Sequence, residues 1–135
     1  MSEERAFDRR RFRRHELAGG WIAIVGRSAE DNDDLSLRLS EPQDYWFHVC
    51  GCPGSHVLLL HRPDLEPPRE ILEQAAALAA WYSKARAAGE ARVTLTRAGQ
   101  VSKSHGLAPG QVLVQRERIL KVVPGLPPEA EPPRA

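Results

Sequence analysis

Residues 44–60 read Asp-Tyr-Trp-Phe-His-Val-Cys-Gly-Cys-Pro-Gly-Ser-His-Val-Leu-Leu-Leu, and this stretch decides the fold. Its two ends, residues 45–49 and 56–60, hold the aromatic, β-branched and aliphatic residues that are typical of strands. Proline presets the first central position of a turn, and glycine tolerates the positive backbone angle that a type II turn needs at the second. The Pro53-Gly54 pair therefore predicts a type II turn that closes an antiparallel hairpin.

The sequence on either side of the hairpin predicts more strands and one helix. Residues 28–34 are rich in Asn and Asp and predict a turn, while Leu35, Leu37 and Leu39 alternate with polar residues as in a half-buried strand. Alanine-rich residues 69–88 have apolar side chains at spacings of three and four, which predicts a helix. Other strands are expected at residues 21–25, 93–96, 112–114 and 119–123. The predicted fold class is α+β, a single domain in which a mostly antiparallel sheet of six to seven short strands packs against one long helix.

The two ends of the chain differ from its middle. Residues 5–14 hold six arginines and one aspartate, although the net charge of the whole chain is only +1. We expect residues 1–15 to be a basic arm, helical or disordered, residues 16–124 to be the folded domain, and the proline-rich residues 125–135 to be disordered. No apolar run is long enough to span a membrane. Only two cysteines occur, which fits a reducing cytosol, so we expect a cytoplasmic protein.

The hairpin also carries side chains suited to a binding site. On a strand, Asp44, Trp46 and His48 share one face, and a tight turn would bring His56 close to His48. An exposed tryptophan can stack on a nucleobase, and imidazoles can bond to phosphate or ribose. The backbone amides of Gly54, Ser55 and His56 are expected to converge on an anion. The alternative is that the aromatic rings belong to the core and that the histidines are satisfied polar groups.

Two chemical alternatives exist for the same segment. His48, Cys50, Cys52 and His56 are four zinc-ligand types within nine residues, but Cys-Gly-Cys is too short for the usual zinc knuckle. We therefore expect no metal. His48 and His56 could also act as base and acid on a ribose 2′-hydroxyl, although their spacing does not require it. No pattern of the chain indicates a nucleotide cofactor, and no cofactor is expected.

Basic residues outside the hairpin are candidates for phosphate contacts. Lys84 and Arg86 lie in the last turn of the predicted helix, Arg27 follows a strand and Gly26, and Lys103 and His105 lie in a loop rich in Gly and Pro. Cations gathered in this way indicate a polyanionic partner, because each phosphate contact releases condensed counterions. The alternative is ordinary solvation of a helix end and a loop.

Several linked motifs resemble one known family. They are Gly26-Arg27, Asn32-Asp33, Asp44-x-Trp-Phe-His48, Pro53-Gly-Ser-His-Val57, Ala75-Ala-x-Leu-Ala-Ala-Trp-Tyr-Ser-Lys-Ala-Arg86 and Gly106-x-x-Pro-Gly-x-Val112. In order and spacing they are similar to the NFACT-R domain, from about Phe12 to Pro124. That domain is the RNA-binding part of NFACT proteins, which bind tRNA on stalled large ribosomal subunits. The resemblance implies a bacterial, stand-alone RNA-binding domain in translation quality control.

The resemblance sets the expected partners and site. The partner would be RNA, tRNA above all, and the large ribosomal subunit is a further candidate; nothing in the sequence fixes the oligomeric state. Ser102, Ser104 and Ala108 depart from a more basic loop in the family, which predicts fewer phosphate contacts. An RNA-processing or RNA-modification enzyme using His48 and His56, and a protein-interaction module, are the alternative functions. The predicted RNA-binding residues are Arg27, Asn32, Asp44, Trp46, His48, Gly54, Ser55, His56, Lys84, Arg86, Lys103 and His105.

Overall fold

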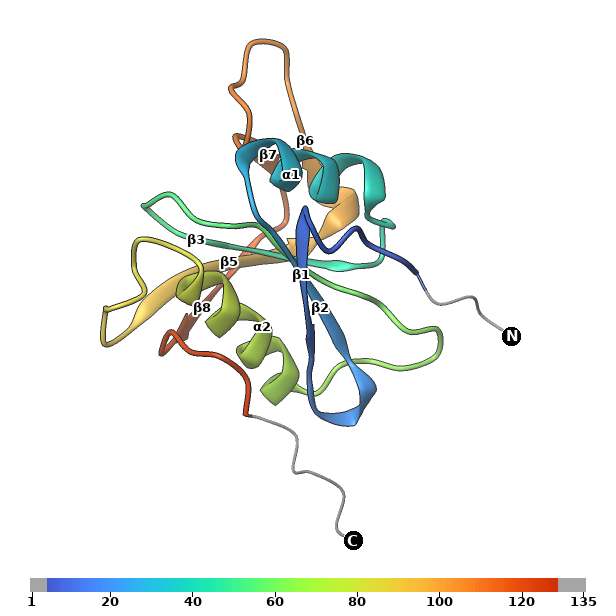
Figure 1. Cartoon of the computed structure of the whole chain (residues 1–135), viewed down its shortest axis with the longest axis vertical. Helices are drawn as coiled ribbons and strands as arrows, with labels where there is room; N and C mark the ends of the chain where they lie inside the picture. The colour runs from blue at the N-terminus through green and yellow to red at the C-terminus, as the bar shows by residue number, and fades with distance from the viewer. Residues whose placement is uncertain (1–4, 129–135) are drawn as a thin grey trace, which may run out of the picture.

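A six-stranded antiparallel sheet is the centre of the molecule. A computed structural model of the chain describes residues 5–128 (Figure 1). The strand order is β1-β2-β4-β3-β5-β8, and β6 and β7 form a separate pair. The strands are β1 (Phe12–Glu16), β2 (Ile22–Gly26), β3 (Tyr45–Val49), β4 (Val57–Leu59), β5 (Ala91–Arg97), β6 (Val101–Ser102), β7 (Leu113–Val114) and β8 (Arg118–Val122). The α+β class and the antiparallel sheet are confirmed, with six strands in the main sheet.

Helices cover the two faces of the sheet. Helix α2 (Arg69–Trp81) packs on one face, over a core that includes Phe47, Leu59 and Val93. Helix α1 (Ala29–Asp34) and the π-helical turn that follows it, Leu35–Leu39, lie over the other face, where Leu35 joins a smaller cluster with Phe12, Ile24, Leu58 and Ala98. Figure 1 shows α1 and α2 on separate parts of the sheet. Each face of the sheet therefore has its own hydrophobic cluster.

The prediction for residues 28–39 was wrong, because this segment is helical. The Ser28 side chain caps α1 by accepting a hydrogen bond from the Asp31 amide at 3.0 Å. Glu30 and Asp31 stand in the first turn, where negative charge is favoured by the helix dipole. Leu35 is buried, whereas Leu39 is 42% exposed. Only the first of the three alternating leucines is therefore buried, as a helical turn allows and a half-buried strand does not.

The helix that was expected at residues 69–88 is shorter in the structure. Helix α2 has 13 residues and ends at Trp81, not at residue 88, so one long helix is wrong. The chain turns away after Trp81 to pair with the hairpin: the Ser55 amide donates to the Tyr82 carbonyl at 2.9 Å, and the Lys84 amide donates to Pro53 at 3.1 Å. These bonds replace the helical ones. They place Lys84 beside the tip of the hairpin.

The β3–β4 hairpin is confirmed, but its turn chemistry was misread. Gly51, with φ at 79°, adopts the positive backbone angle, and Gly54 does not. Gly54 is needed for a different reason: a Cβ there would lie 2.6 Å from the Ser83 Cβ and 3.0 Å from the Val49 Cγ1. The missing side chain is what allows the hairpin to approach the end of α2.

The two ends of the chain also differ from expectation. Within the predicted arm, Phe12–Glu16 forms edge strand β1, paired antiparallel with β2, and is neither helical nor disordered. In the predicted tail, the Gly125 amide donates to the Ala77 carbonyl at 3.3 Å. Residues 129–135 of that tail lie outside the described residues. Among residues 5–128, the helices are too short and too polar to cross a membrane.

Candidate functional site

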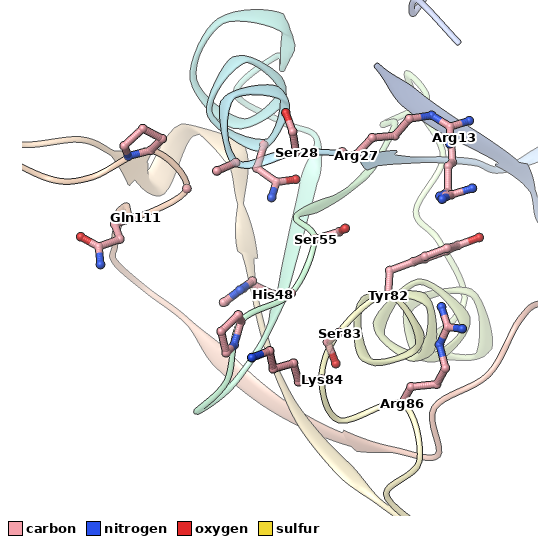
Figure 2. A pocket seen from close by; sticks show the side chains of 17 residues that line it. Arg13, Arg27, Ser28, His48, Ser55, Tyr82, Ser83, Lys84, Arg86 and Gln111 are labelled. Carbon is pink, nitrogen blue, oxygen red and sulfur yellow. The ribbon is translucent and has the colours of Figure 1, made fainter. Parts of the chain in front are cut away.

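A cleft of about 760 Å³ opens where five segments meet. They are strand β1, the junction of β2 and α1, the β3–β4 hairpin, the segment after α2 and the loop before β7. Figure 2 shows Arg13, Arg27 and Arg86 on one side of this space, with Lys84, His48 and Gln111 on the other. The described residues that line the cleft include no Asp or Glu. The cleft is thus a basic surface without carboxylates to neutralise it.

A second groove of about 350 Å³ continues the first one across β1. It shares Arg13, Arg27 and Tyr82 with the cleft and adds Arg9 and Arg14. No carboxylate residue lines this groove either, within the part of the chain that the structure describes. The basic surface is therefore longer than a single pocket.

Aromatic rings hold two of the guanidinium groups in place. The Arg13 guanidinium lies 4.9 Å from the centroid of the Tyr82 ring, and the Arg86 guanidinium lies 4.4 Å from the Trp81 ring. Arg86 Nε also donates to the Trp81 carbonyl at 2.6 Å. Tyr82 is itself fixed by His15, whose Nε2 lies 2.9 Å from the tyrosine hydroxyl. Stacked guanidinium groups keep edges free to donate hydrogen bonds, so these two are already oriented for an anion.

Lys84 and Arg27 complete the basic side of the cleft. Both are exposed. Arg27 Nε donates to the Arg9 carbonyl at 3.1 Å, which fixes its direction but does not neutralise its charge. Within residues 5–128, the Lys84 ammonium has no ion pair or hydrogen bond. Figure 2 shows its side chain directed toward His48. Arg27, Lys84 and Arg86 therefore lie at one site, as their predicted role requires.

The two histidines of the hairpin lie together at the base of the cleft. Their ring centroids are 5.1 Å apart, which confirms that the hairpin brings them close. His48 lines the cleft, whereas His56 is 1% exposed. His56 Nε2 lies 3.1 Å from the Gly110 carbonyl oxygen, and Nδ1 lies 2.7 Å from Ser36 Oγ. Because a carbonyl can only accept, Nε2 carries the proton and Nδ1 accepts from Ser36.

Both histidines are neutral at neutral pH. Burial, with a smaller contribution from His48, lowers the pKa of His56 to about 4. Burial also lowers the pKa of His48. The positive charge of the cleft at neutral pH therefore comes from Arg and Lys, and His48 offers a neutral imidazole to a ligand.

Trp46 and Asp44 are placed inside the protein, not on its surface. Trp46 is 1% exposed, and its Nε1 donates to Ser36 Oγ at 2.8 Å, so stacking of a base on this ring is contradicted by its burial. Asp44 is 0% exposed and accepts bonds from the His61 amide and the Arg5 guanidinium, both at 2.9 Å. These hydrogen-bond partners explain why the polar groups of Trp46 and Asp44 are buried. The alternative that placed the aromatic ring in the core was correct.

Asn32 fixes the hairpin beneath the cleft. Its Oδ1 accepts from the His56 amide at 3.0 Å, and the side chain is 7% exposed. A Cβ at residue 26 would lie 2.0 Å from this oxygen, so Gly26 is required for the contact. Asn32 also lines the cleft, and its bond to the hairpin holds two segments together.

The predicted anion site on the hairpin amides is wrong. The Ser55 amide donates to Tyr82, and the His56 amide donates to Asn32. Amides already bonded inside the protein cannot converge on a phosphate. Gly54 and the Ser55 side chain still line the cleft, and Figure 2 shows the Ser55 hydroxyl pointing into it.

Lys103 and His105 do not join the cleft. Lys103 Nζ bonds to Asp33 Oδ2 and to the Ala108 carbonyl, both at 2.8 Å, and to the Gln111 carbonyl at 2.9 Å. Lys103 thus closes its own loop onto α1 and has no donor left for a phosphate. His105 is exposed in that loop and does not line the cleft.

The arginine arm is mostly neutralised inside the protein. Four of its six arginines form ion pairs: Arg5 with Glu41 and Asp44, Arg10 with Asp8, Arg11 with Asp31 and Asp34, and Arg14 with Glu16. Only part of the arm is therefore available to a polyanion. Arg13 is the main contributor that prediction missed, and it could have been found by treating residues 12–16 as a strand, where Arg13 and His15 share one face.

The cysteines are free thiols. Among the described residues, the one group of side chains close enough to hold a metal ion is Glu41, Asp44 and His61, away from Cys50 and Cys52. The Arg5 guanidinium already bonds to Glu41 and Asp44, each at 2.9 Å, and supplies a positive charge there.

Comparison with known proteins places the chain in a family. Residues 10–116 match the family model described as the NFACT protein RNA binding domain. The chain is 35% identical over 106 residues to the Rqc2 homolog RqcH of Streptococcus suis, and 31% identical over 110 residues to that of Bacillus subtilis. These matches cover 78% and 82% of this chain but 19% of each relative.

A further relative and a solved structure support the same family. A coiled-coil domain-containing protein 25 homolog of Dictyostelium discoideum is 32% identical over 108 residues, which are 76% of this chain and 52% of that protein. The solved C-terminal part of a fibronectin/fibrinogen-binding protein from Streptococcus suis superposes with a TM-score of 0.79 at 32% identity, covering 90% of this chain and 49% of that one. By sequence and by fold, the chain belongs to the family of NFACT protein RNA binding domains.

Proposed function

We propose that the chain is an RNA-binding module that holds tRNA through the basic cleft, in the cytoplasm and in ribosome quality control. The observation that carries the proposal is the cleft itself: Arg13, Arg27, Lys84 and Arg86 line it, and no described carboxylate does. A phosphate backbone is the partner that such a surface fits, because its charges are regularly spaced and its oxygens accept from guanidinium and ammonium groups.

The ring contacts add support for a backbone ligand. Arg13 and Arg86 are stacked on Tyr82 and Trp81, so their planes are fixed before a ligand arrives. Pre-organised donors lose less conformational entropy on binding than free side chains do. These stacks also cover one side of each aromatic ring, which leaves less surface for bases. We therefore propose recognition of the backbone more than of base sequence.

The family and its named relatives support RNA binding in ribosome quality control. The family is described as an RNA binding domain, and two of the relatives are named Rqc2 homolog RqcH. The chain spans about a fifth of the length of those relatives. We propose that this domain binds tRNA, with the large ribosomal subunit as a further partner.

Binding is favoured over catalysis by the state of His56. The ring is 1% exposed, both of its nitrogens are bonded inside the protein, and its pKa is lowered to about 4. A general acid or base needs access to the reacting atoms and a pKa near the working pH. Only His48 reaches the cleft, and one neutral imidazole fits a contact to phosphate or ribose.

The test is tRNA binding measured by fluorescence anisotropy at low salt. The double substitution Lys84→Ala with Arg86→Ala should weaken binding at least tenfold, because two of the four cleft cations are lost. The matched control is Arg69→Ala with Arg118→Ala, which removes the same charge from residues that do not line the cleft. Thermal melting checks that both variants fold. Unchanged tRNA affinity of the cleft variant, or equal loss in the control, would refute the proposal, and tRNA cleavage that His48→Ala abolishes would favour an enzyme.

A further inference from the structure

The sheet face opposite α2 is open over β5 and β8. Residues directly opposed in an antiparallel pair point to the same side of a sheet. Thr94 of β5 is opposed both to His48 of β3 and to Ile119 of β8, so these three side chains form a row across the sheet. Ile119 is 41% exposed, although it lies in the middle of a strand. Helix α1 and the π-helical turn pack elsewhere on this face, over a cluster that includes Phe12, Ile24 and Leu58.

Two positive charges stand side by side on this open face. Arg92 and Lys121 are direct partners in the β5–β8 register, and both are exposed. Each lies two residues along its strand from Thr94 or Ile119 and therefore on the same face. Like charges opposed across a sheet destabilise it. Within residues 5–128 neither side chain forms an ion pair or a hydrogen bond, although Glu90 and Glu117 are near in sequence.

His48 connects this face to the cleft. It lines the cleft, and it is also the first member of the row that continues through Thr94 to Ile119. A ligand that leaves the cleft past His48 therefore meets Arg92 on the neighbouring strand β5 and then Lys121 on β8. The Thr94 hydroxyl, 3.3 Å from Cys50 Sγ, adds a polar group between the two basic surfaces.

We propose that the open face of β5 and β8 is a second RNA-binding surface, where Arg92 and Lys121 bind phosphates of the same RNA that occupies the cleft. The proposal rests on the proposed function of the cleft and extends its footprint. A phosphate placed between the two cations neutralises their repulsion and satisfies donors that have no partner in the protein. Ile119 and Thr94 offer apolar contact and a hydroxyl to the intervening sugar, so recognition there does not depend on base sequence.

The test compares RNAs of increasing length. The variant Arg92→Ala with Lys121→Ala removes the proposed surface. The control Arg69→Ala with Arg118→Ala removes the same charge, and Arg118 lies on β8 itself, opposed to the core residue Leu95. Wild type and control should gain affinity as the RNA grows beyond the cleft, whereas the variant should stop gaining. For a single strand, the slope of log affinity against log salt should fall by about 0.7 per lost contact, so by about 1.4 in the variant.

The outcomes separate this proposal from the one on which it rests. If the Arg92/Lys121 variant bound long RNA with the same affinity and the same salt slope as the wild type, the second surface would be overturned. The proposal for the cleft would stand in that case, provided that the Lys84/Arg86 variant still loses binding. Equal losses on short and long RNA would also overturn it, because the effect would then be one of overall charge. A wild-type protein that binds no RNA overturns both proposals. Melting curves confirm that the compared variants are folded.

Discussion

At the scale of single residues, buried side chains position the binding residues without touching the ligand. Trp46 Nε1 donates to Ser36 Oγ, which donates to His56 Nδ1, and His56 Nε2 donates to the Gly110 carbonyl. The chain of bonds runs from β3 through the π-helical turn to the loop before β7. Each donor meets one acceptor, so the network is satisfied only when His56 is neutral.

The state of His56 predicts a loss of stability in acid. Its pKa in the folded protein is about 4, below the ordinary value of 6.5, so the unfolded chain binds the proton more readily. The contribution to stability is therefore complete above pH 6.5 and is lost as the pH falls toward 4. A difference of about 2.5 pKa units corresponds to roughly 3 kcal/mol.

Urea unfolding between pH 4 and pH 7 measures this effect. The wild type should lose free energy of unfolding as the pH falls, and His56→Gln should lose less over the same range, because it has no imidazole to protonate. His48 and His15, whose pKa values are also lowered by burial, give both proteins a shared background. The same pH dependence in wild type and His56→Gln would contradict the assignment.

At the scale of elements, short segments depend on one another for their positions. The loop between β6 and β7 is held to α1 by Lys103, which bonds to Asp33 Oδ2, while Asp33 Oδ1 accepts from the Gly110 amide. The Lys103 ammonium also bonds to two carbonyls within the loop. One lysine thus sets the position of the wall of the cleft that carries Gly110 and Gln111.

Removal of this lysine should loosen the loop and leave the sheet intact. In Lys103→Met the ammonium is lost, Asp33 keeps only its bond to Gly110, and two loop carbonyls lose a donor. Amide hydrogen exchange at Gly110 should become faster, while exchange in β3 and β5 stays slow. Arg38→Met is a control, because Arg38 also pairs with an α1 carboxylate, Asp34, at 3.7 Å but is 79% exposed. Equal protection of Gly110 in both variants would disprove the role of Lys103.

The elements that sequence predicted well are those with a strong local pattern. The β3–β4 hairpin, strand β5 and the body of α2 follow from alternation, a proline-glycine pair and helical spacing. The prediction for residues 28–39 is wrong because Leu35, Leu37 and Leu39 fit an alternating pattern, whereas the Ser28 cap favours a helix. The end of α2 could not be predicted, because it depends on pairing with a hairpin distant in sequence.

In the candidate site, too, the sequence predicted the position of some residues correctly and that of others not. The basic residues Arg27, Lys84 and Arg86 were identified from their type and place, and they line the cleft. Asp44 and Trp46 were assigned to the surface although they are buried, because polarity and aromaticity do not reveal which face of a strand is covered. The carboxylates that neutralise Lys103 and Arg11 come from α1, whose position required the structure.

At the scale of the whole molecule, the distribution of charge matters more than its sum. The net charge is +1, yet two connected grooves are lined by cations and by no described carboxylate. Carboxylates of α1 pair instead with Arg11 and Lys103, and those near β3 pair with Arg5. These paired carboxylates lie outside the grooves, so the positive charge of the grooves is separated from them and a nearly neutral protein presents basic grooves.

This separation predicts that RNA binding depends strongly on salt. Each phosphate contact contributes about 0.7 to the slope of log affinity against log salt for a single strand and about 0.9 for a duplex. Four contacts, from Arg13, Arg27, Lys84 and Arg86, should therefore give a slope of at least about 3 in magnitude. A protein that interacts only through its net charge of +1 should give a slope near zero or one. Anisotropy titrations of tRNA at several salt concentrations distinguish these cases. In the Arg13→Ala variant the magnitude of the slope should fall by the contribution of one phosphate contact. In Arg10→Ala the slope should not change, because the Arg10 guanidinium is paired with Asp8.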